Sequence, residues 1–98
     1  MTLPTGDPPL AALKQWLAIS TPSEDALLER LLTVAYETCG GFVGAAALPE
    51  DWADIPPSLA EGILRFAAHL YRARDHADES APPAAVAALW RPWRALRL

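Results

Sequence analysis

The sequence has few residues that could build a catalytic site, a metal site or a disulfide. Cys39 is the single cysteine among 98 residues, so no disulfide can form within the chain, and this suits a reducing cytoplasm. His69 and His76 lie seven positions apart, about 10 Å along a helix, which is too far for one metal ion. The glycines lack the context of a phosphate-binding loop, and no serine has that of a nucleophile elbow. We therefore expect no enzyme, no metal and no cofactor.

Charge is also sparse, and it is unevenly distributed. Charged residues make up 20% of the chain, and the formal net charge is −4. Residues 1–54 carry eight acidic and two basic side chains, whereas residues 55–98 carry four acidic and six basic ones. A general nucleic-acid binder needs a basic surface that neutralises phosphates, so this balance disfavours one. No apolar run is long enough to span a bilayer, and we expect no signal peptide and no membrane partner.

Apolar residues, in contrast, are abundant for so short a chain. They make up 52% of the sequence, and this fraction includes four tryptophans: Trp16, Trp52, Trp90 and Trp93. A domain of this size buries only a modest fraction of its surface. We therefore expect partner proteins to cover part of the apolar surface.

The longest helical pattern covers residues 21–40. Thr21 and Glu24 have the spacing of a capping box, with Pro22 at the first helical position. Gly40 and Gly41 predict the end of the helix, because glycine adopts the left-handed conformation at little steric cost.

The apolar positions of this helix cover about half of its circumference, which is wider than the stripe of about 100° that suffices for one neighbour. They are Leu27, Leu28, Leu31, Leu32, Val34, Ala35, Thr38, Cys39 and Phe42. Cys39 falls on this arc, so we expect a buried and inert thiol. The excess width predicts contacts with neighbouring subunits, for which the candidates are Trp16, Leu28, Leu32, Trp52 and Tyr71.

The remaining pattern predicts an all-α fold, a small bundle of three to four helices with a protruding C-terminal arm. We expect a helical body over residues 1–80, with further helices at about 8–19 and 57–75. Residues 81–98 are expected to form a short helix, ended by Pro92, and the arm. Residues 41–55 are compatible with an extension of the long helix, a short strand or a loop, and their second half is acidic.

The C-terminal residues alternate large apolar groups with arginine: Trp90, Arg91, Pro92, Trp93, Arg94, Leu96 and Arg97. One interpretation is an amphipathic helix folded onto the body. A second is a docking arm, because tryptophan and arginine dominate binding hot spots. Binding of DNA phosphates is a third, weaker one, since three arginines give little affinity at physiological salt. The docking interpretation predicts that removal of the chain after Leu89 leaves the fold intact.

The order of these segments resembles the head-tail connector (adaptor, head-completion) proteins of siphophages and of phage-like particles such as gene transfer agents. The resemblance covers roughly residues 10–94. It is carried by a long helix introduced by Ser-Glu-Asp-Ala-Leu-Leu (23–28), by a helix opened by Ile-Pro-Pro-Ser-Leu (55–59) with His-Leu-Tyr near its end (69–71), and by the closing Leu-Trp-Arg-Pro-Trp-Arg (89–94).

This resemblance implies a structural protein that forms a ring, typically dodecameric, below the portal of a virion or phage-like particle assembled in the bacterial cytoplasm. Such a ring extends the DNA channel, and duplex DNA passes through it without specific binding. The implied partners are the portal protein, further copies of the chain and the next head-completion or tail protein. By this analogy, Trp90 to Arg97 would contact the portal or a neighbouring subunit.

Two other interpretations remain open from the sequence. A short connection between the first two helices suggests a small helical DNA-binding regulator. Neither the long helix nor the third one, however, carries the row of basic and amide side chains that reads a major groove. A homodimeric helical bundle without a phage connection is the other alternative.

Overall fold

The computed structural model describes residues 7–44, 48–73 and 81–95 and shows an all-α fold there, as predicted. The elements are α1 (Asp7–Leu17), α2 (Asp25–Val43), the 3-10 turn η2 (Trp52–Asp54), α3 (Pro57–Arg72) and α4 (Ala84–Ala95). Phe42 and Val43 extend α2, and no strand occurs in the described part of residues 41–55.

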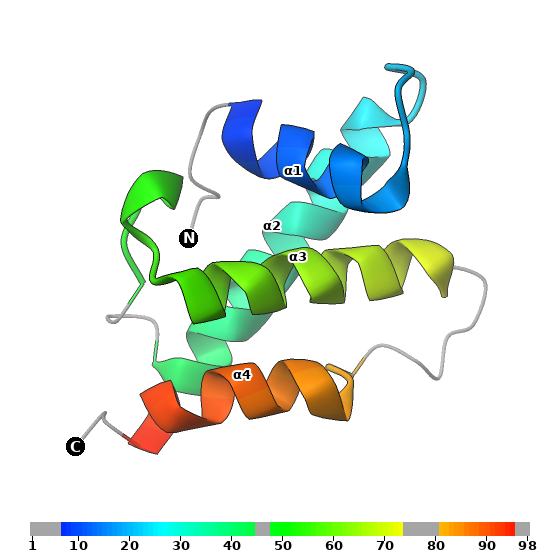
Figure 1. Cartoon of the computed structure of the whole chain (residues 1–98). Coiled ribbons are helices and arrows are strands. Elements are labelled where there is room, and N and C mark those ends of the chain that lie inside the picture. Colours follow the sequence, from blue (N-terminus) through cyan, green and yellow to red (C-terminus); the bar gives the residue numbers. More distant parts are fainter. Residues whose placement is uncertain (1–6, 45–47, 74–80, 96–98) are drawn as a thin grey trace.

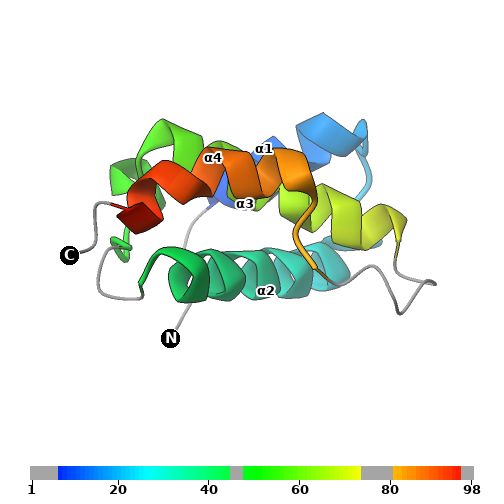
Figure 2. The same cartoon turned by 90° about the horizontal axis from the view of Figure 1, so that it is seen from below.

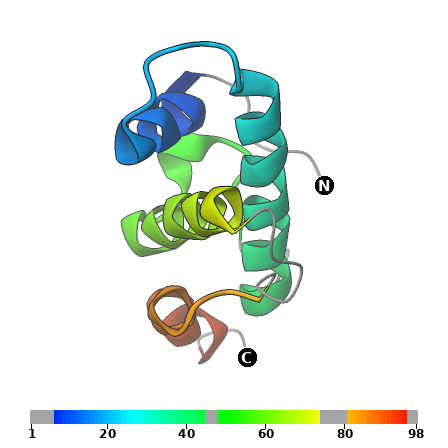
Figure 3. The ribbon, with the colours of Figure 1, turned by 90° about the vertical axis from the view of Figure 1, so that its right-hand side faces the viewer.

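The helices form two layers (Figures 1–3). Helices α1, α3 and α4 lie side by side in one layer with α3 in the middle, and α2 crosses behind all three. The core lies between α2 and this three-helix layer. Its largest fully buried side chains include Leu13, Leu28, Leu32, Tyr36, Leu59, Ile63, Phe66 and Trp90.

Helix α1 ends in a Schellman-type turn that the sequence did not signal, because its left-handed residue is an alanine. Ala18 has a φ of 59°, and its amide donates to the Gln15 carbonyl. The Ile19 amide donates to the Lys14 carbonyl at 2.9 Å, and the Ile19 side chain packs against the core. The connection to α2 therefore covers residues 18–24 and is longer than the sequence suggested.

Both ends of α2 differ from the prediction. The helix begins at Asp25, and no side chain caps it; the Thr21 hydroxyl instead lies 3.1 Å from that of Ser23. At the other end, the helix continues through Gly40 and Gly41 to Val43, and Gly44 takes the left-handed conformation with a φ of 101°. Gly40 is buried in the helix and does not end it.

Helix α4 also extends beyond the prediction, because Pro92 lies inside it rather than ending it. Proline removes the bond to the carbonyl four residues earlier, that of Ala88. Ala88 and Pro92 are both exposed, so water can reach that carbonyl. On the opposite side, Trp90 and Trp93 hold the helix to α3.

The predicted protruding arm is not seen as far as the structure describes the C-terminal segment. α4 packs against α2 and α3, and its Val86 and Trp90 belong to the same core as the body. Of the three interpretations of this segment, the described residues agree with the helix folded onto the body. The ranges 7–44, 48–73 and 81–95 include no helix long and apolar enough to cross a membrane.

Candidate partner-binding surfaces

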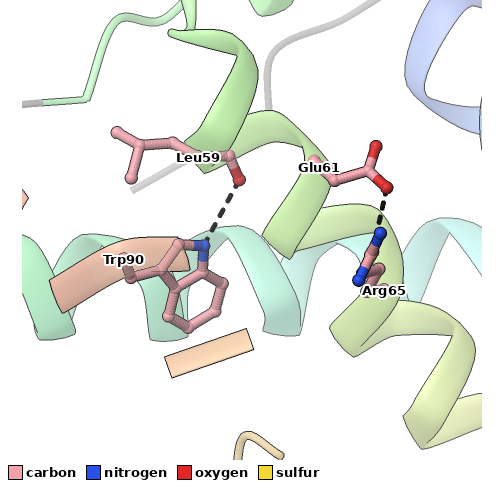
Figure 4. Close-up of polar contacts among 4 residues, drawn as sticks. All are labelled: Leu59, Glu61, Arg65 and Trp90. Atoms are coloured by element: carbon pink, nitrogen blue, oxygen red, sulfur yellow. Dashed lines mark hydrogen bonds and ion pairs between the residues drawn. The ribbon is translucent and has the colours of Figure 1, made fainter. Parts of the chain in front are cut away.

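Trp90, the first residue of the predicted docking segment, is fully buried within its own chain. Its indole Nε1 donates a hydrogen bond of 3.3 Å to the Leu59 carbonyl of α3 (Figure 4). The ring lies against Gly62, where a Cβ atom would come within 2.8 Å of Trp90 Cε2. Trp90 therefore seals the contact between α3 and α4 and is not available to a partner.

The rest of the docking segment is more open. Trp93 is half-buried, and its indole nitrogen donates to the Ser58 hydroxyl at 2.8 Å. Arg91, Pro92 and Arg94 are exposed, and the Arg94 guanidinium lies over the Phe42 ring of α2, 5.2 Å from its centroid. Leu96 and Arg97 lie outside the described residues. A partner at this end of α4 would thus meet arginines and one edge of Trp93.

Helix α2 has two apolar sides with different surroundings. Leu28 and Leu32 are 0% exposed, so these two predicted interface residues belong to the core and cannot touch a neighbour. Leu27 and Leu31 are half-buried, and Val34 is 42% exposed. Their four- and three-residue spacing places them in one row along the helix, and we call this row the α2 stripe. The excess apolar width is real, but it lies on the stripe rather than on Leu28 and Leu32.

Trp16 lies beside a groove in the three-helix layer. It is 43% exposed, and the Arg65 guanidinium of α3 lies over its ring at 5.5 Å from the centroid. Arg65 also bonds Glu61 at 2.9 Å (Figure 4). The groove has a volume of about 470 Å³, and we call it the Trp16 groove. Its lining comes from α1, α3 and the start of α4: Trp16, Arg65, His69, Arg72, Ala73, Pro83, Ala85 and Val86.

The acidic turn, residues 50–54, lies before α3. Glu50, Asp51 and Asp54 are exposed, and Trp52 is half-buried against the core. The Asp51 carboxylate accepts from the Ala53 amide at 3.1 Å and so holds the 3-10 turn. The Tyr36 hydroxyl donates to the Pro49 carbonyl at 3.0 Å and ties the turn to α2. Burial, and then the Glu50 charge, raises the pKa of Tyr36, so this donor keeps its proton.

The titratable groups of the described residues do not converge on a reactive site. Burial raises the pKa of the Cys39 thiol to about 12, which leaves it protonated and a poor nucleophile. Within these residues, no cluster of three or more His, Cys, Asp or Glu side chains could hold a metal ion. His69 lines the Trp16 groove, whereas His76 lies outside the described ranges.

Three contacts that shape these surfaces were missed at the level of sequence. The contact of Gly62 with Trp90 was the easiest of the three to predict, because a lone glycine inside a helical pattern often has a packing reason. The Trp93–Ser58 hydrogen bond and the Arg94–Phe42 contact join residues 35 and 52 positions apart, and no local pattern signals them. Tyr71, a predicted interface residue, is half-buried and packs against the core.

Comparison with known proteins identifies the family of the chain. No curated protein and no solved structure matches the chain. A family model does match, over residues 9–84, from the third residue of α1 through α2, η2 and α3 to the first residue of α4. This match covers more than three quarters of the chain. The chain therefore belongs to the phage gp6-like head-tail connector protein family.

Proposed function

We propose that this protein is a structural adaptor that forms a ring below the portal of a phage or phage-like particle. Membership of the connector family makes it a virion component that interacts with portal and tail proteins, in a family that is structural rather than enzymatic. The ring, its extension of the DNA channel and its docking of the next head-completion or tail protein are the parts we propose.

The proposed ring is supported by two separate uncovered apolar sites on one chain. Trp16 and Val34 are the exposed large apolar side chains among the described residues, at 43% and 42%. Trp16 opens onto the three-helix layer, whereas Val34 lies on α2 in the other layer. Two different patches suit head-to-tail contacts, which close into rings, whereas a two-fold dimer pairs one patch with itself.

The mass of the protein in solution, measured by light scattering alone and with a portal ring, tests this proposal. We expect a ring mass in at least one of the two conditions. The variant Val34→Glu should lose it, because a charge would be buried in the subunit contact. Ala26→Glu is the matched control, since it adds the same charge at an exposed position elsewhere on α2. A wild-type protein that stays monomeric in both conditions would contradict the proposal.

We further propose that DNA passes through the ring without specific binding, and the net charge of −4 supports this. The alternative function, a small helical DNA-binding regulator, was suggested by a short connection between the first two helices, and the structure does not show such a connection. A helix-turn-helix joins its helices by a turn of roughly three or four residues, whereas residues 18–24 separate α1 from α2. Duplex binding that weakens steeply with salt would favour the regulator.

A further inference from the structure

Two features of opposite charge remain without a role, the acidic turn and the Trp16 groove. The turn presents the exposed carboxylates of Glu50 and Asp54, with the Asp51 carboxylate already engaged by the Ala53 amide. Among the described residues that line the groove, Arg65 and Arg72 are exposed cations and none is acidic, and Arg65 also bonds Glu61 at 2.9 Å. The described residues of the two features therefore carry opposite charges.

The acidic turn and the Arg72 end of the groove lie at opposite ends of α3, so these two cannot meet within one chain. Two residues separate the acidic turn from Pro57, the first residue of α3, whereas Arg72 is the last. Fifteen residue steps separate Pro57 from Arg72, which is about 22 Å at the helical rise of 1.5 Å per residue. Figure 1 shows the turn in green at one end of α3 and the start of α4, which lines the groove, at the other.

The size of the groove is compatible with a compact turn. The turn is a compact single turn of 3-10 helix that the Asp51 cap and the Tyr36–Pro49 hydrogen bond hold in place. The groove, at about 470 Å³, is in the size range that holds a few side chains or a small ligand. Its wall contains an exposed indole, the side chain most often found at the centre of a binding hot spot.

We propose that the acidic turn of one subunit docks into the Trp16 groove of the next subunit. This inference rests on the proposed ring and names the contact that closes it. Glu50 and Asp54 lie against Arg65 and Arg72, and Trp16 covers the turn. Because donor and acceptor sites lie at opposite ends of α3, each contact leaves one free site of each kind, and the chain of contacts continues until the ring closes.

Disulfide trapping with the full chain tests this contact. The double variant Asp54→Cys/Arg72→Cys, oxidised under conditions where the wild type assembles, should give a ladder of covalent multimers up to the size of the ring. A disulfide needs Cα atoms within about 7 Å, so the pair cannot close within one chain. Cys39 is buried and does not compete. Each single-cysteine variant should stay uncrosslinked, and symmetric dimers from either would overturn the proposal.

A mixing experiment tests the polarity of the contact. Arg72→Glu breaks only the groove, and Asp54→Lys breaks only the turn, so each variant alone should need at least about tenfold more protein to assemble. In an equimolar mixture, the unchanged turn of the Arg72→Glu chain meets the unchanged groove of the Asp54→Lys chain, and the two altered sites carry opposite charges. The mixture should therefore assemble again, with the two chains alternating. The chain with both changes restores opposite charges and should assemble again. Glu29→Lys on α2 is a control that makes the same charge change as Asp54→Lys at an exposed position outside both features and away from the α2 stripe.

These experiments separate failure of the contact from failure of the ring. If the wild type assembles but the cysteine pair gives no ladder, the ring stands and this contact is wrong. If Arg72→Glu leaves the ring intact and abolishes only portal binding, the groove holds an acidic segment of the portal rather than a second copy of this chain. If the wild type assembles neither alone nor on a portal, the proposed function itself fails.

Discussion

Tryptophan has opposite roles on the two sides of α3. On the α4 side, Trp90 is fully buried, fits against Gly62 and satisfies its indole nitrogen with the Leu59 carbonyl. On the α1 side, Trp16 is 43% exposed beside an open groove, with Arg65 over its face. One indole stabilises the fold and the other remains available to a neighbour. Whether an apolar residue in so small a chain serves the core or a partner therefore depends on the residues that cover it, and the residue type alone does not decide this.

Trp90→Ala should produce the largest loss on the sealed side of α3. Removal of a fully buried tryptophan costs about 3–5 kcal/mol of unfolding free energy, a large part of the stability of a domain of this size. Truncation after Leu89 should be at least as damaging, contrary to the docking-arm interpretation. Chemical denaturation followed by circular dichroism measures both. A truncated chain that retains wild-type stability would show that the contact between α3 and α4 contributes little to the fold.

Leu32→Ala and Leu31→Ala extend the comparison to α2. Leu32 is 0% exposed, so its truncation should cost about 2–5 kcal/mol. Leu31 is half-buried on the α2 stripe, and its truncation should cost clearly less in the monomer but weaken ring formation. Denaturation midpoints and light scattering together give both quantities. Equal losses of stability in the two variants would mean that the stripe belongs to the core.

Gly62→Ala should lower stability even though alanine is the better helix former. The propensity gain is about 1 kcal/mol, whereas the new methyl group would collide with the Trp90 ring, which is buried and cannot move aside. Overpacking of this kind costs about 1–3 kcal/mol. The pair Gly62→Ala/Trp90→Leu should lose less stability than the sum of the two single variants, and a denaturation series over the four chains measures this coupling.

The buried Cys39 thiol makes the stability of the core depend on pH. Its pKa is raised to about 12 in the folded protein, against an ordinary value of 9.0. Between these values the unfolded chain loses a proton that the folded chain keeps. The free energy of unfolding should therefore fall as pH rises above about 9, by up to about 1.4 kcal/mol per pH unit. Denaturation between pH 8 and 10 measures the slope, and Cys39→Ala should flatten it.

Trp16→Ala should have the smallest effect on stability and a clear effect on assembly. It removes a partly exposed ring and its contact with Arg65, a loss of about 1 kcal/mol. Subunit association should weaken at least tenfold, because tryptophan hot spots carry a large share of binding energy. Light scattering after a denaturation control separates the two effects. A stability loss as large as that of Trp90→Ala would remove the distinction between the two sides.

The sequence predicted the elements of the fold better than their ends. Helical spacing located α1, α2 and α3 and the apolar width of α2, because these signals are periodic and local. The helix ends depend on single residues, and here these residues do not follow their usual preferences. Pro92 remains inside α4 because Trp90 and Trp93 anchor the helix, and Ala18 rather than glycine closes α1. Tertiary contacts decide such cases, and no local window contains them.

The candidate surfaces were predictable only in part, for a related reason. Periodicity showed that α2 has too wide an apolar arc, but it could not show which edge its own neighbours cover. Leu28 and Leu32 were therefore predicted to contact a neighbouring subunit, whereas Leu27, Leu31 and Val34 are the residues that the structure leaves partly uncovered. Likewise, alternation of tryptophan and arginine near the C-terminus indicated an amphipathic segment. Whether Trp90 faced inward or outward depended on Gly62, 28 positions earlier.

The hydrogen bond from the Tyr36 hydroxyl to the Pro49 carbonyl has a consequence for the speed of assembly. A loop that has to become ordered on meeting its partner loses conformational entropy at that moment, and the encounter is less often productive. The acidic turn is already held by α2, so in the proposed ring a joining subunit would meet a preformed turn and not a flexible segment. Tyr36→Phe should therefore leave the final ring unchanged while its formation becomes slower.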